Sequence, residues 1–367
     1  MDLSDKSNKK LRTGFTTGTC ATASSKAALL AIIEQNSVND VDVLLPKRDR
    51  IKIKINSCEF SKSHAKCSVI KDGGDDPDVT HGAEIFVDLS LTDDIGSVEI
   101  DGGEGVGRVT KPGLGLEIGG AAINPTPKKM ILENVQEVGE QILKQNGIKI
   151  VISVPKGKEL AVKTDNPRLG IMDGISILGT SGIVIPYSTA SFAAAIRQQI
   201  DVVRSMNDDV VFLTTGGRSE DFARKIIELP DHSFIQMGDF SGYAISQCVK
   251  NNINKVYIGG FIGKFAKMAT GVKQTHVKGS KVNMGFLSEL AKKCKAEERI
   301  IKKIKNANTA RNVQEIILEN NVEGFFDEIC SNVYKQMKSS SKINIEIILF
   351  DFDGSVLARY PSSKGFY

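Results

Sequence analysis

Two hydrophobic patterns follow each other along this chain, and the first occupies residues 1–165. Short segments such as VDVLLP, IKIKI and EIFVDLSL alternate apolar and polar residues, as strands do when one face of their sheet meets solvent. An alanine-rich stretch predicts a helix that starts near Thr19, and an amphipathic segment predicts a second helix that ends at Gly147. We therefore expect an N-terminal α+β domain.

The second pattern runs over residues 166–367, where apolar runs alternate with helical segments. The runs ISILGTSGIVI, DVVFLTT, SFIQMG and KVYIGG are each followed by a stretch with helical character. This order predicts a parallel sheet with helices on both faces, hence a Rossmann-like α/β domain. C-terminal helices and a hairpin that turns at Asp353–Gly354 complete the prediction. The domain boundary near Asn166–Pro167 is inferred from the change of pattern alone.

Composition narrows the class of protein. A length of 367 residues fits two domains of ordinary size. The 48 basic and 44 acidic residues are mixed along the chain and give a formal net charge of +4. This mixture argues against a nucleic-acid or membrane partner, whereas small anionic ligands stay compatible with it.

Cysteine and histidine spacing indicates a reduced, cytoplasmic protein without its own metal. The six cysteines form no C-x-x-C pair, the N-terminus MDLSDKSNKK has no apolar signal core, and no apolar run approaches the roughly 20 residues of a membrane helix. The histidines, His64, His81, His232 and His276, lie far apart. Because none has the spacing of metal ligands, we expect no metal site on the protein.

A glycine-rich run, GGEGVGRVTKPGLGLEIGGAAINP, extends from Gly102 to Pro125. Glycine lets the backbone turn tightly and brings its N–H groups close to a ligand, and Arg108 and Lys111 add positive charge. The run predicts a loop that binds an anionic partner. A set of tight turns between short strands is the alternative.

A threonine-rich loop, TGFTTGTC, opens the first predicted helix at residues 13–20. The N–H groups and dipole of a helix N-terminus attract carboxylate or phosphate, so Thr16, Thr17 and Thr19 are candidate anion ligands. The alternative is a structural role for this loop, as a threonine cap of the helix followed by a glycine turn. A nucleophilic role for Cys20 is a further alternative, but no histidine lies nearby in sequence to activate it.

An acidic loop, KDGGDDPDVTHG, covers residues 71–82 and holds four aspartates and His81. Its carboxylates are compatible with ribose hydroxyls, with a magnesium ion or with a solvated turn. His81 is a candidate proton acceptor, because the ordinary pKa of histidine lies near neutrality.

The predicted parallel strands end in small residues. Ligands of open α/β sheets bind at the carboxyl ends of the strands. In this chain those ends are TTGGR at 214–218, MGD at 237–239 and IGGFIGK at 258–264. A second ligand site is therefore expected at this edge of the sheet.

Five segments together resemble one enzyme family. They are LRTGFTTGTCATA, KDGGDDPDVTHG, the glycine-rich run, DNPRLGIMDGISILGTSGIVIP and FIGKFAKMATGVKQTH, in this order. This series resembles the cobalt-precorrin-5B C1-methyltransferase family (CbiD) of anaerobic cobalamin biosynthesis. The resemblance covers roughly residues 11–280, and five motifs in order are far more specific than any one of them.

The resemblance implies transfer of a methyl group from S-adenosylmethionine to ring carbon C1 of cobalt-precorrin-5B, which gives cobalt-precorrin-6A. The cobalt belongs to the substrate and not to the protein. The resemblance also implies an N-terminal domain like the second domain of ribosomal protein S5. A non-catalytic carrier or scaffold for a tetrapyrrole, and an enzyme acting on nucleotides or sugar phosphates, are the competing hypotheses. Homo-oligomers and transient contacts with other enzymes of the pathway are left open.

The resemblance and the loops together predict three groups of site residues. Candidate substrate ligands, chosen for the carboxylates of the macrocycle, are Arg12, Thr16, Thr17, Thr19, Arg108, Lys111, Arg168 and Lys264. Candidate catalytic residues are His81 and Asp75. Candidate ligands of S-adenosylmethionine, at the strand ends, are Thr215, Gly216, Gly217, Gly238, Asp239, Gly259 and Gly260.

Overall fold

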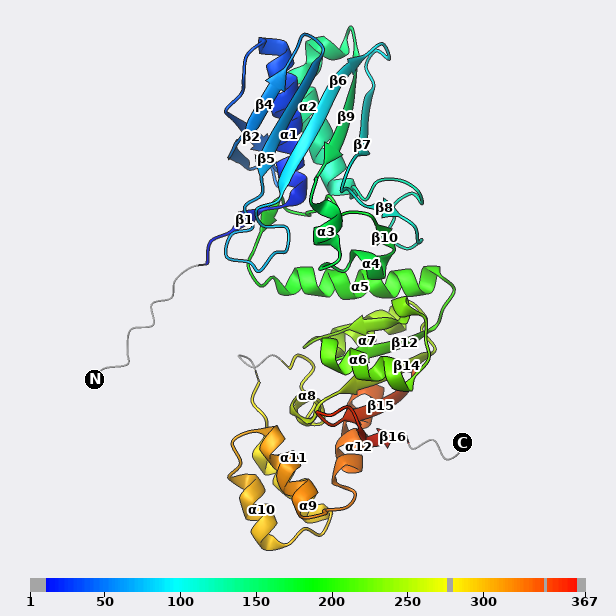
Figure 1. Ribbon diagram of the computed structural model, residues 1–367. Helices are drawn as coiled ribbons and strands as arrows, with labels where there is room; N and C mark the ends of the chain where they lie inside the picture. The colour runs from blue at the N-terminus through cyan, green and yellow to red at the C-terminus, as the bar shows by residue number, and fades with distance from the viewer. Residues whose placement is uncertain (1–10, 276–279, 340–341, 362–367) are drawn as a thin grey trace, which may run out of the picture. The chain divides into compact units, whose positions relative to one another are not determined.

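The protein, described here by a computed structural model over residues 11–275, 280–339 and 342–361, divides into two compact units. The first unit ends at Thr189 and the second begins at Ala190 (Figure 1). The N-terminal segment MDLSDKSNKK and His276 lie outside the described residues. Each unit is described by itself below.

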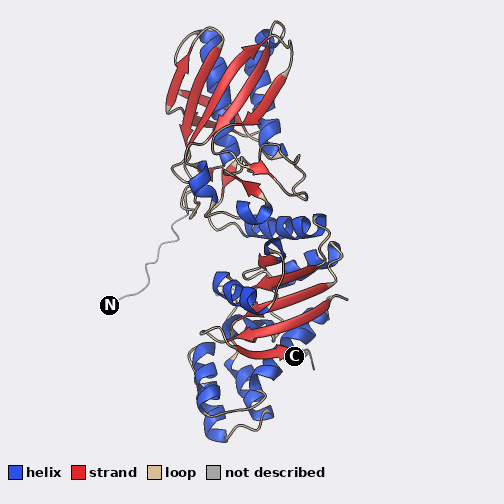
Figure 2. Ribbon diagram, turned by 45° about the vertical axis from the view of Figure 1, so that its right-hand side comes forward, coloured by secondary structure: helices blue, strands red, loops and turns tan. Residues whose placement is uncertain are grey.

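The first unit contains a five-stranded mixed sheet with the order β4-β5-β6-β9-β7. Its strands are β4 (Ser57–Phe60), β5 (His64–Ile70), β6 (Glu84–Thr92), β9 (Gly147–Ser153) and β7 (Val98–Gly102). All neighbours pair antiparallel except β7 and β9, which are parallel. The long helices α1 (Thr17–Glu34) and α2 (Pro125–Leu143) pack against each other, and α1 contacts the sheet at β5 and β6 (Figures 1 and 2).

The alternation in sequence predicts which strand positions are buried. Along β6 the side chains of Ile85, Val87 and Leu89 are buried, and their neighbours in sequence are half-buried. Helix α1 begins two residues before the expected start near Thr19, with Thr16 as its cap. Smaller elements complete the unit: the hairpin β2 (Asp40–Leu44) and β3 (Arg50–Lys54), and the short helices α3 (Gly157–Ala161) and α4 (Asn166–Leu169).

Two further strand pairs place residues 171–184 inside the first unit. Strand β10 (Ile171–Met172) pairs with β8 (Arg108–Val109), and β11 (Ile183–Val184) pairs with β1 (Gly14–Phe15). The buried amide of Asn166 donates to the carbonyl of Gly174. The division at Thr189 therefore lies farther along the chain than the expected boundary near Asn166, because these contacts fold back onto the first unit.

The second unit is built on a five-stranded sheet with the order β13-β12-β14-β15-β16. The strands are β13 (Phe234–Gln236), β12 (Val210–Thr214), β14 (Lys255–Gly260), β15 (Asn344–Phe350) and β16 (Val356–Tyr360). The first four are parallel, and β16 is antiparallel. Strands β12, β13 and β14 correspond to the expected DVVFLTT, SFIQMG and KVYIGG, whereas ISILGTSGIVI, also expected here, lies in the first unit and β15 was expected only in the hairpin. In chain order this is 2-1-3-4-5, a doubly wound arrangement that differs from the 3-2-1-4-5-6 order of dinucleotide-binding Rossmann sheets.

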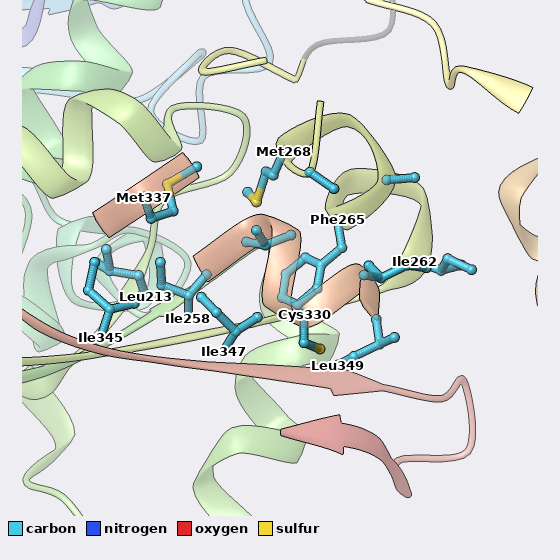
Figure 3. Packing of buried hydrophobic residues seen from close by; sticks show 14 of the residues in the cluster. Leu213, Ile258, Ile262, Phe265, Met268, Cys330, Met337, Ile345, Ile347 and Leu349 are labelled. Carbon is cyan, nitrogen blue, oxygen red and sulfur yellow. The ribbon is translucent and has the colours of Figure 1, made fainter. Parts of the chain in front are cut away.

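Alternate residues of the central strands supply two separate cores. Val211 and Leu213 of β12 belong to the larger core, together with apolar residues of α5 (Thr189–Ser205), α7 (Ser241–Lys250), α8 (Ile262–Met268) and α12 (Phe325–Lys338). Figure 3 shows Phe265, Met268, Cys330 and Met337 from these helices above Leu213, Ile258 and Ile347 of the strands. Phe212 belongs to a smaller core with residues of α6 (Gly217–Ile226). The sheet therefore has helices on both faces.

The C-terminal region adds three helices and the predicted hairpin. Helices α9 (Met284–Lys293), α10 (Glu298–Lys305) and α11 (Ala310–Glu319) contribute apolar residues to the larger core, and a short 3-10 turn, η1 (Asp231–Ser233), precedes β13. The hairpin β15–β16 turns where expected, at Asp353–Gly354. However, β15 is also an interior strand of the parallel sheet, since it pairs with β14 on its other side.

Substitution of Gly105 by alanine will strongly destabilise the first unit. Gly105 has φ +69°, and a Cβ atom there would lie 1.8 Å from the carbonyl oxygen of Val154. We expect a loss of roughly 3 kcal/mol in the free energy of unfolding, of which about 1–2 comes from the left-handed backbone and the rest from the clash. Urea unfolding followed by circular dichroism measures this loss.

The matched control is Gly115→Ala, because Gly115 has nearly the same φ, +67°, but nothing within 4 Å of the added atom. It is expected to cost only about 1 kcal/mol. Equal losses in the two variants would show that the close backbone approach at Gly105 does not matter.

Candidate active site

The threonine-rich loop serves the fold of the first unit. Thr16 caps α1 by accepting a hydrogen bond from the backbone N–H of Thr19. The hydroxyl of Thr17 donates to the carbonyls of Ser176 and Leu178, and that of Thr19 donates to Gly182 at 2.6 Å. All three threonines are buried. These contacts argue against the expected role of the three threonines as anion ligands, because residues 176–182 occupy the N-terminus of the helix.

The aspartates of the acidic loop also have internal partners. Asp75 accepts a hydrogen bond from the backbone N–H of Arg12 at 2.7 Å, and Asp76 accepts one from that of Tyr187 at 2.8 Å. Asp72 forms an ion pair with the guanidinium of Arg12, and this hydrogen bond holds the pKa of Asp72 below its usual value. The carboxylate of Asp75 thus anchors the chain at Arg12, which argues against the catalytic role expected for it.

His81 lies beside the same loop with an exposed ring. Its Nδ1 atom accepts a hydrogen bond from the backbone N–H of Gly73 at 3.0 Å. In the neutral ring the hydrogen must then reside on Nε2, so the exposed edge offers a donor. This arrangement argues against the expected proton acceptor and favours a group that donates a hydrogen bond to a ligand.

A buried ion pair holds the acidic loop in place. The ammonium of Lys71 lies 2.5 Å from Asp78 Oδ2, and the Lys71 side chain is 1% exposed. Burial by itself raises the pKa of Asp78, but the hydrogen bond and charge of Lys71, with two hydrogen bonds from Thr80, lower it overall. Nearby Cys20 is fully buried, and desolvation raises the pKa of its thiol to about 12. Cys20 is therefore not a thiolate nucleophile.

The glycine-rich run combines a packed part and an open part. Gly102–Gly107 lies against residues 151–157 and 171–174, where added Cβ atoms would collide with the backbone or side chains. In the open part, Gly115 and Gly119 have positive φ and free space around them, and Ile118 is exposed. The run is thus partly a set of tight turns and partly an exposed loop.

Four of the predicted cations lie in the first unit. Arg108 forms a bidentate ion pair with Asp101, with N···O distances of 2.9 and 3.3 Å, and also donates to the carbonyl of Gly102. The stem of Lys111 packs against Gly170, directly after Arg168 and Leu169. Strand pairing brings the backbone of Arg108 opposite Met172, which is exposed. Arg108, Lys111 and Arg168 therefore lie on neighbouring segments, whereas Arg12 is held by the acidic loop.

In the second unit, the three predicted strand-end segments meet. Thr214 of β12 pairs with Gln236 of β13 on one side and with Gly259 of β14 on the other. Consequently the groups Thr215–Gly217, Gly238–Asp239 and Gly259–Gly260 lie at one edge of the sheet. The chain leaves β12 toward β13 and returns to β14, so this edge contains the topological switch point at which ligands bind in such sheets.

Open space and an unsatisfied hydroxyl mark this edge. A Cβ atom added to Gly216 or Gly263 would meet nothing within 4 Å, whereas one added to Gly260 would collide with Thr215. The hydroxyl of Thr214 is buried and has no hydrogen-bond partner among the residues that the structure describes. We use the name strand-end crevice for the groups Thr215–Gly217, Gly238–Asp239 and Gly259–Gly260 together with Gly263 in the first turn of α8. Thr214 and Gly263 lie within the predicted strand-end segments but were not among the predicted ligands, because nothing in the local pattern separates them from their neighbours.

Lys264 belongs to this crevice. Its ammonium donates to the carbonyl of Thr215 at 2.7 Å and lies 3.4 Å from Asp239 Oδ1. We expected Lys264 to act with the cations of the first unit on the macrocycle. The structure instead groups it with the predicted ligands of S-adenosylmethionine.

Within the described parts of the chain, the search for other kinds of site gave two results. No group of three or more histidine, cysteine, aspartate or glutamate side chains there is arranged to hold a metal ion. Among the same residues, no helix has the length and apolar character that crossing a bilayer requires.

Comparison with known proteins identifies the family. The CbiD family model matches residues 4–186, and the model of the CbiD C-terminal domain matches residues 274–361. A protein of Priestia megaterium named cobalt-precorrin-5B C(1)-methyltransferase is 46% identical over 96% of this chain and 97% of its own length. The chain belongs to the CbiD family. The strand-end crevice lies between the two matched segments, in a part that this relative also spans.

Other relatives support the same family assignment. Proteins of the same name from Geobacillus kaustophilus and Leptospira interrogans are 48% and 44% identical, over 88% and 96% of this chain and 87% and 96% of theirs. A crystal structure of the cobalamin biosynthesis protein cbiD from Archaeoglobus fulgidus is 26% identical, covers 85% of each chain and has a TM-score of 0.38.

Replacing Asp78 by asparagine will destabilise this CbiD chain at neutral pH, because it leaves the buried ammonium of Lys71 without a counter-charge. We expect a loss of about 3–5 kcal/mol at pH 7, measured by urea unfolding. Since folding lowers the pKa of Asp78 from 3.8, its contribution is complete above that pH and disappears as the pH falls through the lower folded value.

The difference between the wild type and the Asp78→Asn variant should therefore shrink below about pH 4. Asp93→Asn, in an exposed turn, is the control and should have little effect at any pH. A difference that stays constant from pH 7 to pH 3 would contradict the buried ion pair.

Proposed function

We propose that this chain transfers the methyl group of S-adenosylmethionine to C1 of cobalt-precorrin-5B, giving cobalt-precorrin-6A and S-adenosylhomocysteine. The observation that carries the proposal is near full-length similarity, at 44–48% identity, to proteins named cobalt-precorrin-5B C(1)-methyltransferase. The name of these enzymes implies both a methyl donor and a tetrapyrrole substrate. Cobalt enters with the substrate.

We place the methyl donor in the strand-end crevice of the second unit. Three features support this position: the switch point between β12 and β14, the free space beside Gly216 and Gly263, and the unpartnered buried hydroxyl of Thr214. Gly216 and Gly217 also expose backbone N–H groups at the start of α6. The proposed ligands are Thr215, Gly216, Gly217, Gly238, Asp239, Gly259 and Gly260, as the sequence predicts.

We place the macrocycle on the segments of the first unit that carry Arg108, Lys111 and Arg168. A tetrapyrrole with several acetate and propionate groups requires spaced cations, and its ring requires apolar surface. The exposed side chains of Ile118 and Met172 lie on the same segments as these cations. Arg12 and the Nε2–H of His81 are additional donors for carboxylates.

Methyl transfer of this type needs no covalent bond to the enzyme. An electron-rich ring carbon attacks the methyl group in line, and the positive charge on sulfur disappears as the new bond forms. The task of the protein is to hold the two reactants in this geometry, which can supply roughly 7–11 kcal/mol. The buried or paired states of Cys20, Asp75 and Asp78 agree with the absence of a protein nucleophile.

The proposal also covers the fold type of each unit. We propose that the mixed sheet with two long helices in the first unit is a fold like the second domain of ribosomal protein S5. The second unit is proposed as Rossmann-like in the broad sense of a doubly wound sheet with a nucleoside site at its strand ends. Homo-oligomers and contacts with other enzymes of cobalamin biosynthesis stay predictions.

The decisive experiment is anaerobic incubation of the protein with cobalt-precorrin-5B and S-adenosylmethionine labelled in its methyl group. Label at C1 of the product is the expected result. Tight binding of the macrocycle without transfer, and without affinity for S-adenosylmethionine, would favour the tetrapyrrole carrier instead.

Filling the crevice at Gly263 will test the position of the donor. Gly263 lies within α8, where leucine is a better helix former than glycine, so Gly263→Leu should not destabilise the fold. Its side chain would occupy the free space, and we expect the affinity for S-adenosylhomocysteine to fall at least tenfold. Isothermal titration calorimetry measures the affinity. Gly263→Ala, whose methyl group fits, is the matched control; unchanged affinity in both variants would remove the donor from the crevice.

A further inference from the structure

We infer that Lys264 and Asp239 together bind the α-amino-acid end of the methyl donor, with Lys264 on its carboxylate and Asp239 on its ammonium. This inference rests on the proposed function and deepens it. It also reassigns Lys264, which the family resemblance suggested as a ligand of the macrocycle.

Lys264 is anchored in the crevice by two acceptors. Its ammonium donates to the carbonyl of Thr215, at the end of β12, and lies 3.4 Å from the carboxylate of Asp239, which follows β13. An ammonium has three N–H groups, so one of them stays available to a ligand. The Lys264 side chain is 32% exposed, which gives a ligand access to it.

Asp239 is held by Thr275. Its Oδ1 atom accepts a hydrogen bond from the hydroxyl of Thr275 at 2.7 Å, and its backbone carbonyl accepts one from the Thr275 N–H at 3.0 Å. Buried Lys267 in turn donates to the carbonyl of Thr275 at 2.9 Å. Because both close contacts of the carboxylate use Oδ1, Oδ2 has no hydrogen bond from any described residue. Asp239 thus presents a fixed acceptor.

The pairing of opposite charges identifies the ligand. A ligand that carries only carboxylates would be repelled by the Oδ2 atom of Asp239. An α-amino acid has its carboxylate and ammonium on one carbon atom and therefore needs a cation and an anion side by side. The donor ends in such a group, and Lys264 and Asp239 lie at the border of the same crevice as Gly216 and Gly263.

Calorimetric binding of two probes to the full chain tests the pair. The probes are S-adenosylhomocysteine and its analogue lacking the carboxylate. The wild type should bind the complete probe at least 30-fold more tightly. In Lys264→Met the ratio of the two affinities should fall to about threefold or less. The affinity for the decarboxylated analogue should stay within twofold of the wild-type value, which also shows that the crevice is folded. Asp239→Asn should lower the affinity for both probes at least tenfold, since both probes keep the ammonium.

The control is Lys250→Met, an exposed lysine at the end of α7, which should leave both affinities unchanged. A ratio in Lys264→Met equal to that of the wild type would overturn the inference. If, in addition to this unchanged ratio of probe affinities, Lys264→Met bound the macrocycle more weakly, the inference would also be overturned. The carboxylate at Lys264 would then belong to the substrate. Failure of the wild type to bind either probe would instead overturn the proposed function, and this result is distinguishable from the other two.

Discussion

The part of the first unit that carries the glycine-rich run depends on a contact of backbone against backbone at Gly105. Cβ atoms added to Gly157 and Gly174 would lie 2.0 and 2.3 Å from the carbonyl oxygen of Gly105. Three chain segments thus meet at one peptide group without side chains between them. The hydrogen bond from the N–H of Ile175 to the Gly105 carbonyl completes the contact. The loop with Arg108 starts directly after this point, so its position is set by the contact.

In the same part of the first unit, buried polar residues hold neighbouring chain segments together. Thr17 and Thr19 direct their hydroxyls to the carbonyls of residues 176–182, and Lys71 is buried against Asp78. A buried polar group without a partner costs free energy, so each of these contacts specifies how the segments fit. The hydroxyls are therefore used for structure, and Arg108 is likewise held by Asp101 and by the carbonyl of Gly102.

The second unit is built differently, on a doubly wound sheet with its small residues at the strand ends. The order in which the chain adds strands reverses between the parallel strands β12 and β14, and the strand-end crevice lies at this point. Glycines at 216 and 263 keep this space open, whereas those at 259 and 260 let strands and side chains approach closely. Opposite charges at Lys264 and Asp239 then border a space that is otherwise formed by small residues.

The sequence by itself determined the two fold patterns, the parallel strands, the long helices and the segments that carry the chemistry, because hydrophobic period and glycine placement are local properties. It also predicted that the strand-end groups would meet, since parallel strands end at one edge. Only the tertiary structure decided that residues 171–184 complete the first unit and that β15 enters the sheet of the second. Likewise, it decided that Thr17 and Asp75 bind the backbone and that Lys264 joins Asp239. These outcomes depend on partners more than 20 residues away in the chain, as from Lys264 to Asp239, and no local pattern records such a partner.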